Sequence, residues 1–464
     1  MVLERRKGNH PQHSSVIMVE ETVSSSSSTT KLHFHSPLEL ELEEQRQFLP
    51  STGEDEDKEE RVHTSRSKGI SDLEAGFSLA KAIMGAGSFA LPWAFLQMGY
   101  IAGPIFLTLL MAVSIYSLQL LVQCAKYSTS SNRDGHHSSY VQVARAVFGT
   151  TGARLSFVAS CSASIGVCGS YLIFIAANLR SLIDTTISQT TFILLVLPFA
   201  IALSSVRDMK KFAFASLLGD VSVVLGMVVV LVYGLMYHWE TIGTGCVALG
   251  SIETIPLAFG TVGYLFLVHF LSLPIESSME HPERFEQVAR MTFLACAVLS
   301  GSFGILGYLL FGPDTNQIVL LNVQGSFFIA AVKLLLCVDL LLTYPVVMRP
   351  SIVIVEQSVQ LTKGKSRSMT PLVADKSTHL IICILLGIVA AGASIFVPAF
   401  GLLSGLVGGV SQTFLALVLP PLMLNKMQHT TMYHLLSSKG RMMLVVFGVI
   451  MIMWTLVSTI HELS

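Results

Sequence analysis

Long apolar runs recur along this chain, and they are long enough to cross the roughly 30 Å hydrocarbon core of a lipid bilayer. Eleven of them lie at 72–97, 100–124, 152–177, 190–205, 212–237, 252–278, 291–311, 325–347, 379–397, 400–424 and 442–461. Lipid offers no hydrogen-bond partner to backbone polar groups, so such runs cross as helices. The sequence therefore predicts an all-α integral membrane protein with about 11 transmembrane helices.

The composition excludes most other classes of protein. Only 13% of the residues are charged and 52% are hydrophobic, whereas a soluble domain carries roughly 25% charged residues. This excludes a plain cytosolic enzyme, a secreted disulfide scaffold and a disordered protein. The net charge of -1 gives no case for nucleic-acid binding.

The first seventy residues differ from the rest of the chain. They hold 13 of the 30 acidic and 9 of the 29 basic residues, together with a serine run at 24–28 and an acidic stretch at 54–60. No apolar segment follows Arg5, Arg6 and Lys7, as one would in a secretory signal peptide. We expect a disordered cytosolic tail over residues 1–70 and a transmembrane transporter domain over 71–464.

The basic residues predict the orientation of the chain. With the tail in the cytosol and eleven crossings, 17 basic residues fall in inner loops, Arg180 falls in an outer loop, and Lys81 and Lys333 lie within spans. Because positively charged loops mark the cytosolic side, this bias favours a cytosolic N-terminus. The inner residues are Lys126, Arg133, Arg145, Arg154, Arg207, Lys210, Lys211, Arg284, Arg290, Arg349, Lys363, Lys365, Arg367, Lys376, Lys426, Lys439 and Arg441.

Two spans contain residues that interrupt a helix. Residues 84–88 of the first span read MGAGS and are followed by Pro92, so we expect a break near residues 85–87, although glycines also mark close helix packing. About 180 residues later the sixth span carries Pro256, Gly260 and Pro274 around residues 264–269 (YLFLVH). Interrupted segments at corresponding positions of two halves indicate an inverted-repeat transporter with its substrate at the midplane. The amide and carbonyl groups freed at such breaks suit the two charges of an amino acid.

Residues 81–94 (KAIMGAGSFALPWA) resemble the first-helix signature of the amino acid/auxin permease family, in which Gly-x-Gly is followed by small-Leu-Pro. Further matches occur in order within residues 71–461, namely 139–141 with 148–149, 166–174 (GVCGSYLIF) with 178–179, 274–279 (PIESSM) with Pro282 and Phe285, 342–345 (LTYP) with Pro350, and 420–422. The third-helix and sixth-helix segments are most similar to the proton-assisted and vacuolar amino acid transporters. The resemblance implies a leucine-transporter-like fold of five plus five inverted helices with one helix added, moving amino acids with a proton or sodium gradient.

The sixth helix departs from that family pattern. The relatives usually carry Phe-x-Phe-Glu-Gly-x-Gly there, and alignment on Pro274 puts Leu267 in place of the acid and Val268 and Phe270 in place of the glycines. The glycines that mark the family's break are therefore missing from this helix. His269 is the titratable group at that depth, and it is interpreted as a partial replacement of the polar function or as a core histidine.

Ionisable residues inside spans cost about 2.5 to 3.5 kcal/mol each on insertion scales, so each needs a reason. Asp339 and Thr343 share one helix face by i,i+4 spacing, and in this fold that face approaches the first break. Lys81 either pairs with an acid such as Asp339 or extends to the inner surface. Asp220 is interpreted as an ion-pair or vestibule residue, and Lys333 as a lipid-facing or intrahelical residue. We expect ion coupling at Lys81, His269, Asp339 and Thr343.

The substrate is expected at the two breaks and beside the third helix. These residues are Met84, Gly85, Ala86, Gly87, Ser88, Tyr171, Phe266, Leu267, Val268 and His269. The predicted function is secondary active transport of amino acids by proton-coupled symport and alternating access. Small neutral amino acids are the expected substrates. The partners are then the amino acid, a proton or a sodium ion, and the lipid bilayer, and no cofactor or metal is expected.

A rival hypothesis is an amino-acid sensor that signals through the N-terminal tail without much flux. Transport that survives deletion of the tail would separate the two. An enzyme is not expected, because the broken helices carry no cysteine, acid pair or histidine cluster with metal-ligand spacing. Residues 44–49 (EQRQFL) resemble an acidic dileucine-type sorting signal, which favours a vacuolar or lysosomal membrane over the plasma membrane.

Overall fold

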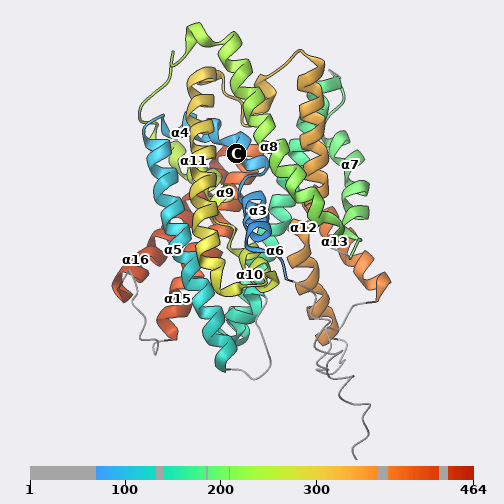
Figure 1. The fold of residues 1–464 in the computed structure, drawn as a ribbon, viewed down its shortest axis with the longest axis vertical. Coiled ribbons are helices and arrows are strands. Elements are labelled where there is room, and N and C mark those ends of the chain that lie inside the picture. The colour runs from blue at the N-terminus through green and yellow to red at the C-terminus, as the bar shows by residue number, and fades with distance from the viewer. Residues whose placement is uncertain are drawn as a thin grey trace, which may run out of the picture. The chain divides into compact units, whose positions relative to one another are not determined.

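The computed structural model describes residues 69–131, 139–183, 186–207, 210–362, 375–427 and 437–463. This part of the chain is helical, with one isolated parallel bridge between Ile70 and Met279. Most of the long helices run roughly along a common axis (Figure 1). The predicted all-α architecture is confirmed.

The helices of the first half are α3 (Asp72–Ile83), the short η1 (Ala86–Ala90), α4 (Leu91–Met98), α5 (Ala102–Ser131), α6 (Tyr140–Ile183), α7 (Gln189–Ser204) and α8 (Lys210–Tyr237). The second half contains α9 (Ile255–Phe266), α10 (His269–Ser278), α11 (Phe285–Phe311), α12 (Phe327–Thr362) and α13 (Lys376–Phe396). Then follow α14 (Phe400–Leu406), the wide π-helical turns η7 (Val407–Gln412) and η8 (Phe414–Val418), α15 (Leu419–Lys426) and α16 (Ser438–Leu463).

Ten helical segments in the described residues are long and apolar enough to span a membrane. The remaining predicted run, 190–205, corresponds to α7, which has 16 residues. At 1.5 Å per residue α7 is about 24 Å long, somewhat shorter than the hydrocarbon core of a bilayer. A multi-pass membrane protein is therefore confirmed, with ten long spans and one short apolar helix.

The outer helices carry a surface that suits lipid. Phe327 at the start of α12 is 90% exposed and Phe396 at the end of α13 is 86% exposed. Large aliphatic side chains are likewise exposed along α13 and α16, among them Leu385, Ile388, Val446 and Ile450. Contiguous apolar surface of this kind is stable against hydrocarbon rather than against water.

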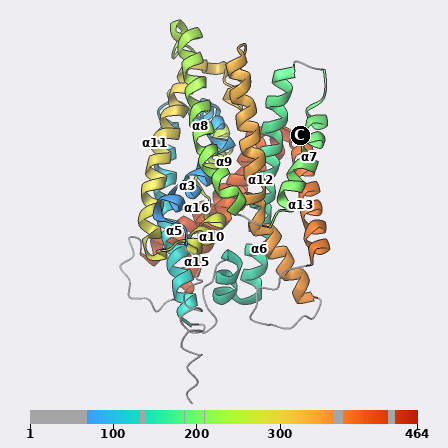
Figure 2. The ribbon, with the colours of Figure 1, turned by 45° about the vertical axis from the view of Figure 1, so that its right-hand side comes forward.

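The helices form two groups with α9 between them. In both views α7, α12 and α13 lie together on one side, and α5 and α11 lie together on the other (Figures 1 and 2). A Cβ atom on Gly260 of α9 would collide with the Gly405 carbonyl, and one on Gly408 of η7 would collide with the Gly260 carbonyl. Glycine permits this backbone contact, which holds α9 in place beside the long span Phe400–Lys426.

A left-handed glycine divides the long helix α6. Gly149 has φ 67° and ψ -148°, a conformation that residues with a Cβ atom rarely adopt. The family matches at 139–141 and 148–149 lie at the two ends of the short helix before Gly149. The part after it forms the third span.

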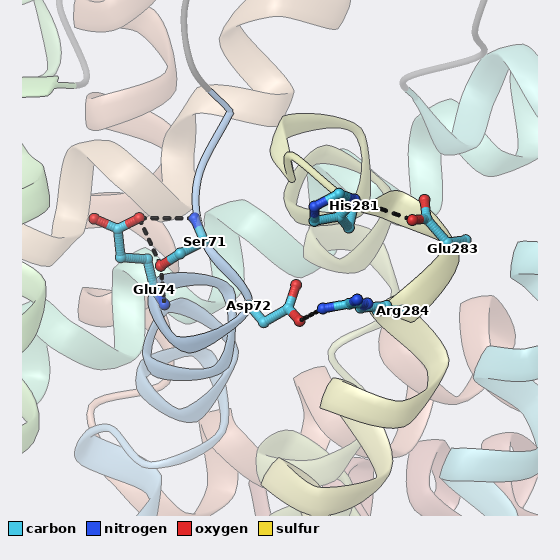
Figure 3. Close-up of polar contacts among 6 residues, drawn as sticks. All are labelled: Ser71, Asp72, Glu74, His281, Glu283 and Arg284. Carbon is cyan, nitrogen blue, oxygen red and sulfur yellow. Dashed lines mark hydrogen bonds and ion pairs between the residues drawn. The ribbon is translucent and has the colours of Figure 1, made fainter.

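The start of α3 is fixed to the segment that follows α10. The Ile70 amide donates to the Ser278 carbonyl at 2.8 Å, and the Glu280 amide donates to the Ile70 carbonyl at 2.9 Å. Figure 3 shows the capping box of Ser71 and Glu74 and the ion pair of Asp72 with Arg284, whose atoms lie 3.2 Å apart. The predicted disordered tail lies outside the described residues, apart from Gly69 and Ile70. A deletion that tests the tail should therefore end at residue 68.

Candidate substrate and coupling site

The first span is broken where the glycines predict a break. Helix α3 ends at Ile83, and Met84 (ψ 83°) and Gly85 (ψ -144°) leave the helical conformation before η1 begins. Helix α4 then starts with Pro92 in its first turn, where a missing amide hydrogen costs nothing. Ala86, Gly87 and Ser88 thus lie in a short 3₁₀ turn rather than in a continuous helix.

The sixth predicted span is also broken, despite the absence of the family's glycines. Helix α9 ends at Phe266, Leu267 (ψ 50°) and Val268 (ψ 26°) are not helical, and α10 begins at His269. The Ser114 hydroxyl of α5 donates to the Phe266 carbonyl at 2.5 Å. Ser114, which the sequence did not single out, therefore satisfies a carbonyl at this break.

Two tyrosines flank the first break. A Cβ atom on Gly85 would lie 3.4 Å from the Tyr171 hydroxyl of α6. One on Gly87 would lie 2.7 Å from the Tyr264 ring and 2.8 Å from Leu265, both on α9. Tyr171 therefore lies beside the break, as predicted, and Tyr264 is an additional residue there. Tyr264 lies one helical turn before Leu267 in the sequence, and this spacing could have indicated that it lies near a break.

Polar atoms beside this break lack partners. The Ser88 hydroxyl and the Tyr264 hydroxyl are both buried and form no hydrogen bond with any residue the structure describes. Buried hydroxyls are nearly always hydrogen-bonded, because removing them from water without a partner is costly. A small polar ligand bound at the first break would supply such a partner.

Lys81 and Asp339 form a buried ion pair between α3 and α12. The ammonium nitrogen lies 2.7 Å from a carboxylate oxygen, and the two side chains are 9% and 5% exposed. The Thr343 hydroxyl donates to the Asp339 main-chain carbonyl at 2.8 Å and lies 3.4 Å from the carboxylate. Three of the four predicted coupling residues therefore meet at one place, one helical turn before the first break.

A second carboxylate, Asp220 on α8, lies within electrostatic range of Lys81 and Asp339. Both of its oxygens are buried without a hydrogen-bond partner among the described residues. The preceding residue, Gly219, packs directly on the pair, because a Cβ atom there would collide with the Asp339 carboxylate and the Lys81 ammonium. Asp220 therefore lies near the Lys81–Asp339 pair without forming an ion pair of its own among the described residues.

A cavity of about 320 Å³ leads to the Lys81 ion pair. Its walls come from α3, α10 and α12, and they include Lys81, Ile275, Thr343 and Arg349. Arg349 is one of the basic residues expected on the inner side. Of the predicted coupling residues, Lys81 and Thr343 line the cavity, whereas Asp339, His269 and the other predicted substrate residues do not.

His269 lies apart from this cluster. Its ring is buried near the main chain of Ser114, and neither ring nitrogen reaches hydrogen-bond geometry with a described group. Lys333 also differs from its prediction, because its ammonium nitrogen lies 3.1 Å from the Ser181 hydroxyl of α6. Lys333 therefore connects two helices instead of facing lipid or its own helix, and the sequence interpretation of it was wrong.

Comparison with known proteins supports the same class. A family model described as transmembrane amino acid transporter protein matches residues 68–461. The chain is 26% identical to amino acid transporter ANT1 of Arabidopsis thaliana over 364 residues, which cover 75% of this chain and 83% of the relative. It is 30% identical to amino acid transporter AVT3B of Arabidopsis thaliana over 290 residues, 60% of this chain and 69% of the relative.

A mammalian relative gives a similar match. The chain is 26% identical to the vesicular inhibitory amino acid transporter of Mus musculus over 373 residues, which cover 76% of this chain and 69% of the relative. The family and these relatives are transporters and not enzymes. With its multi-pass helical fold and its two broken spans, the chain belongs to the transmembrane amino acid transporter family, also called the amino acid/auxin permease family.

Proposed function

We propose that this protein carries small neutral amino acids across a membrane by proton-coupled secondary active transport. The observation that carries the proposal is the pair of broken spans, with the unpartnered hydroxyls of Ser88 and Tyr264 beside the first break. Free main-chain amides at a helix start attract the substrate carboxylate, and free carbonyls at a helix end accept from its ammonium group.

The side chains around the first break favour a small substrate. Gly85 and Gly87 are covered closely by Tyr171, Tyr264 and Leu265, so little volume is left for a large side chain. None of these three residues is charged, which favours a neutral substrate over an acidic or basic one. Met84, Phe266, Leu267 and Val268 complete an apolar surround.

Proton coupling is supported by the charges near Lys81. One ammonium group faces two buried carboxylates, Asp220 and Asp339, and this cluster carries one negative charge too many for a region of low dielectric. A proton on Asp220 would neutralise the excess. The Lys81 ammonium already contacts one oxygen atom of the Asp339 carboxylate, so that oxygen atom is unavailable to coordinate a sodium ion.

In the proposed cycle the cavity that reaches Lys81 and Thr343 gives the cluster access to one aqueous side. Protonation changes the ion pair that joins α3 to α12, and the broken helices then rock against the rest of the protein. We place the protein in an internal, vesicular or vacuolar membrane with the N-terminus in the cytosol. Two observations support this placement. One relative is the vesicular inhibitory amino acid transporter, and basic residues are concentrated in the predicted inner loops.

Thermal stabilisation by ligands tests the proposed site. The purified full chain is heated in detergent with single amino acids added, and small neutral amino acids are expected to raise the melting temperature. Gly87→Val should abolish the effect, because its side chain would fill the break. The matched control is Gly392→Val, whose side chain would enter open space. A well-folded wild type that no proteinogenic amino acid stabilises would contradict the proposal.

A further inference from the structure

A second cavity, of about 690 Å³, lies between the ends of α6 and α12 that carry the predicted inner loops. Its walls include Arg145 and Arg154 from either side of the Gly149 kink, and Ile354 from α12. Figure 2 shows these helices side by side, as their packing requires. The cavity is remote from the helix breaks and shares no residue with the cavity at Lys81.

The charge of this cavity is one-sided. Arg145 and Arg154 are both exposed, and neither forms a hydrogen bond or an ion pair with any residue that the structure describes. No aspartate or glutamate is among the residues that line the cavity. Nearby, the Lys426 ammonium lies 4.9 Å from the centre of the Phe148 ring, which adds a third cation to this corner of the protein.

The other wall of the cavity is apolar and continues onto the lipid-facing surface. It is formed by Phe157, Val158 and Ile354, and Val158 is 60% exposed. Leu155, one residue after Arg154, is 52% exposed. Because α6 and α12 both span the membrane, the arginines lie near the end of an apolar surface, at the depth of lipid headgroups.

We propose that this cavity binds an anionic glycerophospholipid. The phosphate would lie between Arg145 and Arg154, since guanidinium groups bind phosphate oxygens through paired hydrogen bonds. One acyl chain would lie along Phe157 and Val158. The apolar wall is the reason for preferring a lipid to free phosphate, which would leave that wall without a partner. A bound lipid would fix the short helix before Gly149 against α12.

Short-chain lipids test the proposal on the purified full chain in detergent. Binding is measured by native mass spectrometry with dioctanoyl phosphatidylglycerol, dioctanoyl phosphatidylcholine or inorganic phosphate. We expect the phosphatidylglycerol to bind more tightly than the other two. The double variant Arg145→Gln/Arg154→Gln should bind it roughly 10- to 30-fold more weakly. The matched control Arg290→Gln removes an exposed arginine of α11 outside the cavity, and it should bind like the wild type.

Three results would overturn the proposal. They are equal binding of phosphatidylcholine, phosphate alone displacing the lipid at comparable concentration, and unchanged lipid binding by the double variant. A melting curve identifies whether the double variant folds. If it does not, the single variants Arg145→Gln and Arg154→Gln decide, and each should weaken lipid binding several-fold.

Discussion

The Lys81 ammonium and the Asp339 carboxylate lie 2.7 Å apart, although 258 residues separate them in the chain. The pair joins α3, the N-terminal helix of the first broken span, to α12. Both groups are nearly excluded from solvent, so the Asp339 carboxylate depends on Lys81 for neutralisation. This ion pair is the structural link between the predicted coupling residues and the predicted substrate site.

Removing the lysine of this pair should destabilise the protein. Lys81→Met leaves the buried Asp339 carboxylate without its counter-ion, and the expected loss is about 3–5 kcal/mol of folding free energy. The double variant Lys81→Met/Asp339→Leu should recover most of that stability while remaining inactive in uptake. Thermal unfolding followed by size-exclusion chromatography measures the first effect. A Lys81→Met variant that unfolds at the wild-type temperature would contradict the assignment.

A methyl group at Gly219 should disturb the pair without changing any charge. The Cβ atom of Gly219→Ala would collide with both the Asp339 carboxylate and the Lys81 ammonium. We expect uptake to fall at least tenfold while the protein still inserts and purifies. Gly392→Ala is the control, because no described atom lies within 4 Å of its added Cβ. Normal uptake by Gly219→Ala would mean that the geometry of the pair is unimportant for transport.

Asp220→Asn should separate folding from coupling. The carboxylate accepts no hydrogen bond from a described residue, so its amide replacement removes no hydrogen bond and should fold normally. An amide cannot take up a proton, so the uptake of the variant should respond little to a pH gradient that stimulates the wild type. Uptake at several external pH values measures this. A wild-type pH response in Asp220→Asn would move the proton site elsewhere, with Asp339 and His269 as the remaining candidates.

Ten of the eleven predicted spans and the first break could be predicted because both follow from local rules. Hydrophobic length identifies a span, and two glycines followed by a proline weaken a helix wherever it packs. Asp339 and Thr343 were found because i,i+4 spacing places them on one face. Their partner Lys81 followed from the cost of burying a charge alone.

Other site residues depend on tertiary packing, which a single sequence does not contain. Tyr264 and Asp220 are important because of how α9 and α8 are rotated about their own axes, and hydrophobic runs do not determine that rotation. The second break occurs without the family's glycines at Leu267 and Val268. Ser114 lies on another helix and satisfies the carbonyl that this break exposes. Sequence spacing cannot identify that hydroxyl as the compensating group.

Gly87→Val tests the first break as the substrate site. Its side chain would overlap the Tyr264 ring and a Leu265 methyl group, and so would force the first break away from α9. We expect uptake to be abolished while membrane insertion is retained. Membrane fractionation and fluorescence-detection chromatography provide the insertion measurement. Full transport by this variant in proteoliposomes would refute the site.

The most direct test of the central claim is uptake of individual radiolabelled amino acids into proteoliposomes that contain the full purified chain. A pH gradient or a sodium gradient is imposed separately, with protein-free liposomes as the control. The account predicts concentrative uptake of small neutral amino acids that requires the pH gradient, collapses with a protonophore and is indifferent to sodium. Uptake that needs sodium and ignores pH, or no uptake of any amino acid by folded protein, would contradict it.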